Sequence, residues 1–159
     1  MVHLPEELQI ALDADDAQEL DRVIRRQRQA DFDTLVDLLS DPGTSSEYRM
    51  KAFTALGRWG NRGVIPTIRQ ALPQLEDRER IAAIDALGRL GTDEAEEAVS
   101  AYTDDDSPQV RKFVVLALER IGSTAAREKL QGMARQDSDA WIRGFADRRL
   151  GEGTRSHDG

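Results

Sequence analysis

The sequence predicts an all-α protein, an α-solenoid or superhelix of stacked helical hairpins with about nine helices. Two observations carry this prediction. ALGRWG at residues 55–60 returns as ALGRLG at 86–91 and as ALERIG at 117–122, so one ending recurs every 31 residues. The apolar residues within each copy also keep helical spacing. A fixed period of this length is typical of units that cannot bury an apolar face alone and must stack on their neighbours.

The first helix of each unit precedes this shared ending. In the first copy, Ala52, Phe53, Ala55 and Leu56 fall on one stripe of a helix with 3.6 residues per turn. A glycine closes the ending in every copy, where it can end a helix. The residue after it is of a type that favours helix N-caps, so a second helix is expected there. These successive residues are Gly60 and Asn61, Gly91 and Thr92, and Gly122 and Ser123.

The second helices carry a register of their own. Val64, Ala95 and Ala126 align, and residues four positions later align on the same face. Each unit is therefore predicted to be a helical hairpin. An earlier second helix is expected around Leu35, and a last first helix without its partner around Arg143. The repeats are predicted to span residues 31 to 151.

The two ends are expected to differ from the repeats. Residues 1 to 30 read as an N-terminal helical cap of two helices, at 5–13 and 15–29, because the end units of a solenoid must face water. Residues 152 to 159 read as a disordered tail. The whole chain is expected to form one structural domain.

The stretch from Asp105 to Gly122 carries a resemblance to a known family. An acidic residue is followed six positions later by arginine and then by an Ala-Leu-Gly type ending, with Glu119 in place of one glycine. This pattern resembles the short HEAT-like repeats of the phycobilisome bilin lyase type. The resemblance implies that an acidic residue before each first helix bonds the arginine, forming a ladder between units. The matching pairs are Asp105 with Arg111 and Asp137 with Arg143, while Gln74 stands before Arg80.

Composition and the two histidines argue against catalysis. The chain of 159 residues has 30 acidic and 22 basic residues and no cysteine. His3 and His157 lie in the terminal segments, so no catalytic or metal-binding arrangement is visible. We expect no enzyme activity, no cofactor and no metal. No apolar run approaches a membrane span, and a cytoplasmic location is expected.

Nucleic acid is also disfavoured as a partner. Phosphate binding needs clustered basic residues on one face, whereas the net charge here is −8. The best basic cluster contains Arg22, Arg25, Arg26 and Arg28, but acidic residues precede it at a spacing suited to ion pairs along the helix.

A protein-binding scaffold or adaptor fits these observations, with a protein or peptide of positive charge as its partner. The partner is expected on the concave face, lined by the second helices. The residues predicted to contact it are Asp33, Asp37, Arg69, Gln70, Glu97, Ser100, Asp104, Glu128, Gln131 and Arg135. The resemblance implies an alternative, an accessory or chaperone-like subunit of a bilin lyase-type or other enzyme complex.

Two features leave alternatives open. Residues 93 to 106 contain seven acidic residues and no basic one, which suits either helix N-termini or the docking of a basic partner. Trp141, Ile142 and Phe145 near the end of the repeats either close the core or mediate self-association with a second copy.

Overall fold

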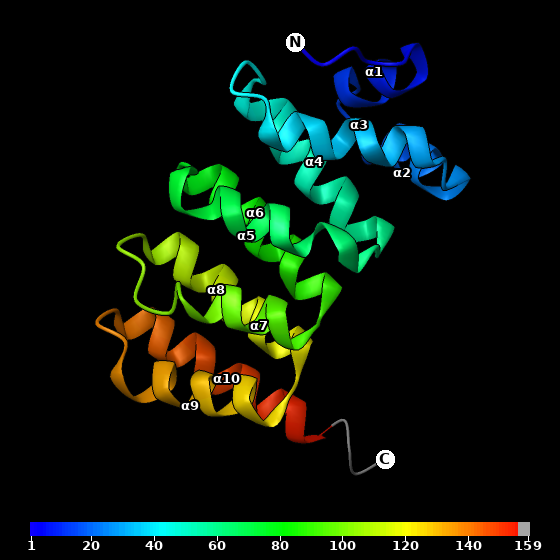
Figure 1. The fold of residues 1–159 in the computed structure, drawn as a ribbon. Helices are drawn as coiled ribbons and strands as arrows, with labels where there is room; N and C mark the ends of the chain where they lie inside the picture. Colours follow the sequence, from blue (N-terminus) through cyan, green and yellow to red (C-terminus); the bar gives the residue numbers. More distant parts are fainter. Residues whose placement is uncertain (156–159) are drawn as a thin grey trace.

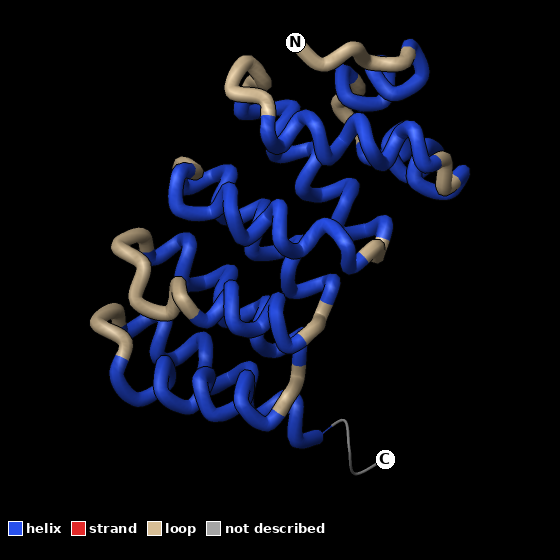
Figure 2. The backbone as a smooth tube through the Cα atoms, viewed as in Figure 1, coloured by secondary structure: helices blue, strands red, loops and turns tan. Residues whose placement is uncertain are grey.

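The computed structural model describes residues 1–155, which form ten α-helices, two short 3-10 helices and no strand. Figure 1 shows them stacked in tiers from the N-terminal end to the C-terminal end, and Figure 2 shows the short loops that join them. The helices are α1 (Glu6–Asp13), α2 (Ala17–Arg26), α3 (Gln29–Ser40), α4 (Ser46–Trp59), η1 (Arg62–Val64), α5 (Ile65–Ala71), η2 (Leu72–Gln74), α6 (Asp77–Leu90), α7 (Asp93–Ser100), α8 (Pro108–Ile121), α9 (Thr124–Gln136) and α10 (Ala140–Arg155).

The helices form two layers, as expected for an α-solenoid. Each first helix packs against the next, so that α4, α6, α8 and α10 form one layer. The second helices α3, α5, α7 and α9 form the other layer. The predicted count of about nine helices is close to the ten observed in residues 1–155.

The helices end and begin where the repeat pattern predicts. The three shared glycines have φ values of +79°, +63° and +68°, and their N–H groups bond the carbonyl of the preceding Leu56, Leu87 or Leu118. Thr92 and Ser123 then cap α7 and α9 through their side-chain oxygens. Asn61 accepts from Gly63 N and begins the 3-10 helix η1 instead, so α5 starts later than its counterparts.

The core is one seam between the two layers. Leu56, Leu87 and Leu118 are fully buried, as are Ile68 and Val99 on the second helices. These side chains belong to one hydrophobic cluster that continues through all the tiers, as expected for repeats that depend on their neighbours for burial. The register read from the sequence therefore identifies the buried stripe correctly.

Successive first helices approach closely at two glycines. A Cβ on Gly57 would lie 2.7 Å from Cα of Ala86, and one on Gly88 would lie 2.8 Å from Cα of Ala117. At the next step Glu119 replaces the glycine and forms an ion pair with Arg149 on α10, at 3.7 Å. The sequence pattern did not show why a glycine is required at this position. The structure shows the reason, which is the close approach of the two helix backbones.

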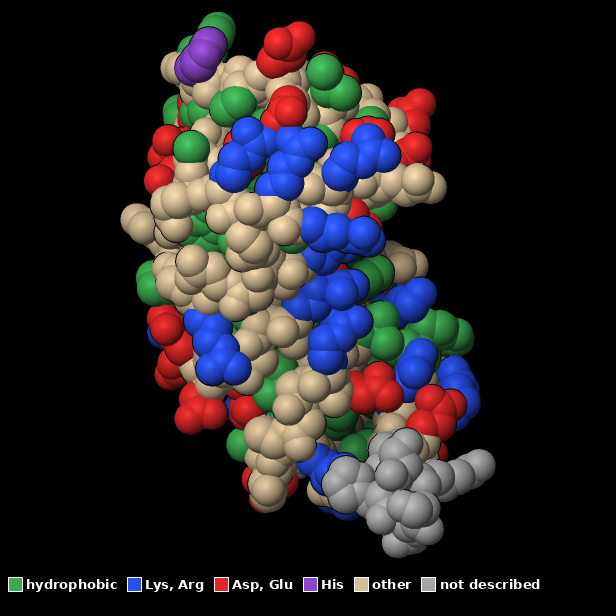
Figure 3. All heavy atoms as spheres, turned by 90° about the vertical axis from the view of Figure 1, so that its right-hand side faces the viewer, with side chains coloured by type: hydrophobic (Ala, Val, Ile, Leu, Met, Phe, Trp, Pro, Cys, Tyr) green, Lys and Arg blue, Asp and Glu red, His purple; other side chains and the backbone are tan. Residues whose placement is uncertain are grey.

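This close approach sets the curvature of the stack. Successive first helices approach backbone to backbone at Gly57 and Gly88 and pack more extensively than successive second helices do, so we assign the first helices to the inner layer. Figure 3, which looks at the right-hand side of Figure 1, shows an outline that is indented on one side. The expectation that the second helices line the concave face is therefore wrong, because the small residues that allow close packing are on the first helices.

The arginine ladder joins neighbouring units, but with different partners from those that the resemblance implied. Arg80 bonds Asp105 of the following unit at 2.8 Å, and Arg111 bonds Asp137 of the unit after it. Within its own unit each arginine donates to main-chain carbonyl groups, as Arg111 does to Asp105 O at 2.6 Å. The aspartate six residues earlier thus contributes its carbonyl, and its carboxylate turns to the preceding tier.

The two ends of the stack differ in part from the boundaries predicted from the sequence. The predicted cap, residues 1 to 30, contains α1 and α2. Helix α10 runs on to Arg155, so residues 152–155 of the predicted tail are helical, and 156–159 lie outside the described residues.

Near the C-terminal end, the burial of Trp141, Ile142 and Phe145 shows which of these side chains close the core and which is open to solvent. Ile142 and Phe145 are 1% and 9% exposed and close the core, whereas Trp141 is 52% exposed and stacks on the ring of Phe145. Asp147 is exposed at the register position that Val115 fills one unit earlier. Helix α10 therefore has an exposed polar residue at a position where the first helix of the preceding unit has a buried apolar one.

Candidate partner-binding surface

The residues predicted to contact a partner lie on α3, α5, α7 and α9 and in the turn after α7, which together we call the second-helix face (Figure 1). Nine of the ten are exposed, and the tenth, Ser100, is half-buried and donates to Glu96 O at 2.6 Å. The sequence register thus finds the solvent side of these helices. The face lies on the outer layer of the stack.

The predicted contact residues on the second-helix face have a net negative charge after the ion pair between two of them is counted. Arg69 and Glu97 form an exposed ion pair at 3.4 Å, which offsets one charge of each sign. The remaining carboxylates, Asp33, Asp37, Asp104 and Glu128, outnumber the remaining base, Arg135. A surface with this balance attracts positively charged partners over several ångströms.

The acidic block at residues 93 to 106 divides between structural and free carboxylates. Glu96 is 6% exposed and accepts from Ser123 Oγ at 2.5 Å, and Asp105 holds Arg80 of the preceding unit. Asp93 and Glu94 lie in the first turn of α7, where carboxylates complement the helix dipole. Asp104 is exposed and belongs to the second-helix face.

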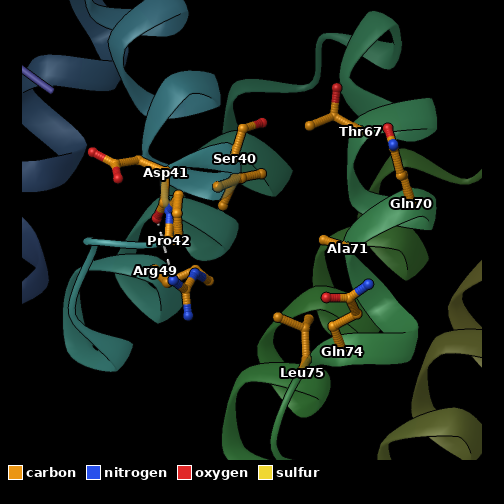
Figure 4. Close-up of a pocket in the computed structure, with 10 residues that line it drawn as sticks. Ser40, Asp41, Pro42, Arg49, Thr67, Gln70, Ala71, Gln74 and Leu75 are labelled. Atoms are coloured by element: carbon orange, nitrogen blue, oxygen red, sulfur yellow. Dashed lines mark hydrogen bonds between the residues drawn. The ribbon is translucent and has the colours of Figure 1, made fainter. Parts of the chain in front are cut away.

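A cleft of about 420 Å³ opens between the first two tiers of this face. Figure 4 shows Ser40, Asp41 and Pro42 on one wall and Thr67, Gln70 and Gln74 on the other. Leu39, Arg49, Ala71 and Leu75 complete the lining. Gln70 is the one predicted contact residue that lines it.

The sequence explains why the tiers separate here. Pro66 is at the start of α5, and Pro73 follows within η2, so this second helix has only seven α-helical residues. Gln74 stands where the ladder pattern has an acidic residue, and Arg49 bonds Glu79 of α6 at 2.6 Å instead. The cleft therefore lies at a unit that departs from the repeat both in its second helix and in its ladder residue.

The polar groups of the cleft differ in their availability. The Asp41 carboxylate accepts from Gly43 N at 2.8 Å and from Val2 N at 3.1 Å, and the Gly43 bond is the main cause that lowers its pKa. Arg49 is held by Glu79 and by the carbonyl of Thr44. Among the described residues, the side chains of Thr67, Gln70 and Gln74 have no hydrogen-bond partner. These three groups are free to pair with a bound chain.

Sequence reasoning missed most of this cleft. Thr67 and Gln74 were not among the predicted contact residues. The signals that could have located it were the two prolines and the glutamine at an acidic ladder position.

Within residues 1–155, no group of three or more His, Cys, Asp or Glu side chains is placed to hold a metal ion. None of the described helices has the length and apolar character needed to cross a membrane.

Comparison with known proteins agrees with the architecture. A solved chain in the complex of CpcE and CpcF of phycocyanin lyase from Nostoc sp. PCC7120 superimposes with a TM-score of 0.66 at 23% identity. The match covers 96% of this chain and 66% of that chain, so it supports the fold. The search among curated proteins found no match. The profile of HEAT repeats matches residues 32–95 and 74–147. The chain belongs to the HEAT-repeat family.

Proposed function

We propose that this protein is a scaffold or adaptor without chemistry of its own, which binds a basic segment of a protein partner on the second-helix face. The observation that carries the proposal is the cleft between α3 and α5, with the free side chains of Thr67, Gln70 and Gln74 along one wall. Free amide groups along a cleft are the donors and acceptors that an extended peptide backbone requires.

The remaining residues of the face supply orientation and charge. Asp37 is an exposed carboxylate on α3, the helix whose C-terminal end forms one wall of the cleft. Leu39 and Leu75 provide apolar surface within the cleft. A partner segment with alternating basic and apolar side chains would therefore place the apolar ones in the cleft and the basic ones beside Asp37.

A second candidate role is that of an accessory or chaperone-like subunit of a larger enzyme complex. The observation that favours it is the structural likeness to a chain solved in the CpcE and CpcF complex. In that role the same face would hold another subunit. The two roles differ in the partner and share the binding surface.

The test uses a fluorescein-labelled peptide with alternating Lys and Leu and measures its binding by fluorescence anisotropy. We expect Gln70→Ala with Gln74→Ala to weaken binding about tenfold, because the lost hydrogen bonds leave peptide groups unpaired. Gln109→Ala, an exposed glutamine on α8, is the matched control and should leave binding unchanged. Equal loss in the control, or no loss in the cleft variant, would rule out the cleft as the docking site.

A further inference from the structure

The concave side of the stack carries a second regular surface. Each first helix is covered by neighbouring tiers and by the second helices, so only one narrow stripe of it is open to solvent. Three positions on this stripe repeat every 31 residues, and together they define the first-helix face. They are Lys51, Ala82 and Phe113, then Thr54, Asp85 and Leu116, then Arg58, Arg89 and Arg120.

The third of these positions is arginine in all three units and forms a column. Arg58 bonds Asp21 at 2.7 Å, while Arg89 and Arg120 both bond Asp85, each at 2.9 Å. Because one carboxylate holds two guanidinium groups, the column keeps a net positive charge. Figure 3 shows Lys and Arg side chains gathered down the middle of the face that lies on the right-hand side of Figure 1, although the whole chain is acidic.

The arginines of the column are positioned but still accessible. The side chains of Arg58, Arg89 and Arg120 are 31%, 37% and 43% exposed. Each guanidinium group has five N–H donors, and the ion pairs occupy only part of them. The carboxylates therefore hold the side chains in place and reduce the entropy that binding would cost.

Apolar side chains lie beside the column. Ala82, Phe113 and Leu116 are partly exposed although they pack against the core. Lys112 lies over the rings of both Phe113 and Trp141, at 6.0 Å and 5.6 Å from the ring centroids. The exposed Trp141 thus continues the same apolar strip onto α10.

We propose that the first-helix face binds an acidic amphipathic helix of a partner protein, lying across α4, α6 and α8. Its carboxylates would meet the arginine column, and its apolar stripe would contact Ala82, Phe113, Leu116 and Trp141. Packed helices lie about 8–10 Å apart, and seven residues of an α-helix rise about 10.5 Å. An acidic residue at every seventh position of the partner would therefore meet one arginine in each unit.

The same observations disfavour nucleic acid on this face. Asp21 and Asp85 offset two of the three arginines of the column, so the column could neutralise few phosphates, whereas nucleic-acid binding depends on many such contacts. The apolar strip also matches a protein side chain better than a charged backbone.

The experiment uses a labelled helical peptide of about three heptads, with Glu at one heptad position and Leu three residues later. A second peptide has Gln in place of every Glu. We expect saturable binding of the Glu peptide and binding at least about tenfold weaker for the Gln peptide. This comparison needs no change in the protein, so misfolding of a variant does not affect it.

Two protein variants locate the binding site. Arg89→Gln with Arg120→Gln should weaken binding of the Glu peptide about tenfold and reduce its salt dependence. Arg127→Gln with Arg135→Gln removes the same charge from exposed positions on α9 and should leave binding unchanged. Gln70→Ala with Gln74→Ala should also leave it unchanged, so this proposal and the role of the cleft succeed or fail separately.

Three results would overturn the proposal. The first is no saturable binding of the Glu peptide. The second is an equal loss in the α9 variant, which would indicate a general charge effect. The third is displacement of the peptide by a duplex DNA oligonucleotide that binds the Arg89 and Arg120 variant more weakly than the unchanged protein. That result would identify a nucleic-acid site instead.

Discussion

Arg111 of α8 donates two hydrogen bonds to the carboxylate of Asp137, of 2.9 and 3.0 Å, across the boundary between two repeats. The two side chains are 8% and 2% exposed. The same guanidinium group also donates to Asp105 O at 2.6 Å. One side chain therefore joins its own loop to the following tier, and this contact couples the stability of neighbouring units.

We expect Asp137→Asn to lower the free energy of unfolding by about 3–5 kcal/mol, because it leaves the buried charge of Arg111 without a counter-charge. Urea unfolding followed by circular dichroism measures this loss. Asp104→Asn changes an exposed carboxylate and should stay within about 0.5 kcal/mol of the unchanged protein. Equal effects of the two substitutions would show that the ladder contributes nothing specific.

Gly88→Ala tests the close approach of α6 and α8. The new Cβ would lie 2.8 Å from Cα and Cβ of Ala117, so one helix must shift, at a cost of about 1–3 kcal/mol. Gly132 lies within α9 with no atom near its Cβ position, and Gly132→Ala should stabilise by about 0.5–1 kcal/mol. Thermal unfolding of both variants gives the comparison, and a neutral Gly88→Ala would contradict the packing described here.

The pH dependence of stability should include a contribution from Asp85. Burial alone would raise the pKa of this carboxyl, but hydrogen bonds from Arg120 and Arg89 outweigh it and hold the pKa below its usual range. A lowered folded pKa stabilises the protein above the unfolded pKa, about 4, and this stabilisation is lost as the pH falls through the folded value. Asp85→Asn should therefore cost stability at pH 7 and much less at strongly acidic pH. A difference that stays constant with pH would contradict this role.

Charge reversal on the second-helix face tests its role in association. Glu97→Lys with Asp104→Lys should slow association of a basic partner peptide and lessen its salt dependence, because both changes remove steering charge. Stopped-flow fluorescence at two ionic strengths measures the association rate. An unchanged rate and salt profile would exclude these carboxylates from the docking surface.

The sequence predicted the fold through the repeat itself, because a 31-residue period fixes both the helical register and the stacking. Leu87 and Ile68 are buried where the pattern placed them. The curvature could not be predicted, because it depends on the three-dimensional contact of Gly57 and Gly88 with the next helix. The partner of each ladder arginine was missed for a similar reason, since sequence spacing does not show to which tier the Asp137 carboxylate turns.

The candidate site was predictable only in part. Helical periodicity identified the exposed side of the second helices, so residues such as Asp37 and Glu97 are on the surface. The cleft lies at an irregular unit, so positions that recur regularly along the sequence do not predict it. The arginine column was visible as a 31-residue repeat of Arg58, Arg89 and Arg120, but its place on the inner layer required the structure.

The most direct test of this account is a pair of amide-resolved NMR titrations on the isotope-labelled protein, one with the basic peptide and one with the acidic helical peptide. The account predicts two separate sets of shifted resonances. The basic peptide should move those around Thr67, Gln70 and Gln74, and the acidic peptide those around Arg89, Phe113 and Arg120. One shared set for both peptides, or no localised set for either, would contradict the claim that the two layers of this stack bind partners of opposite charge.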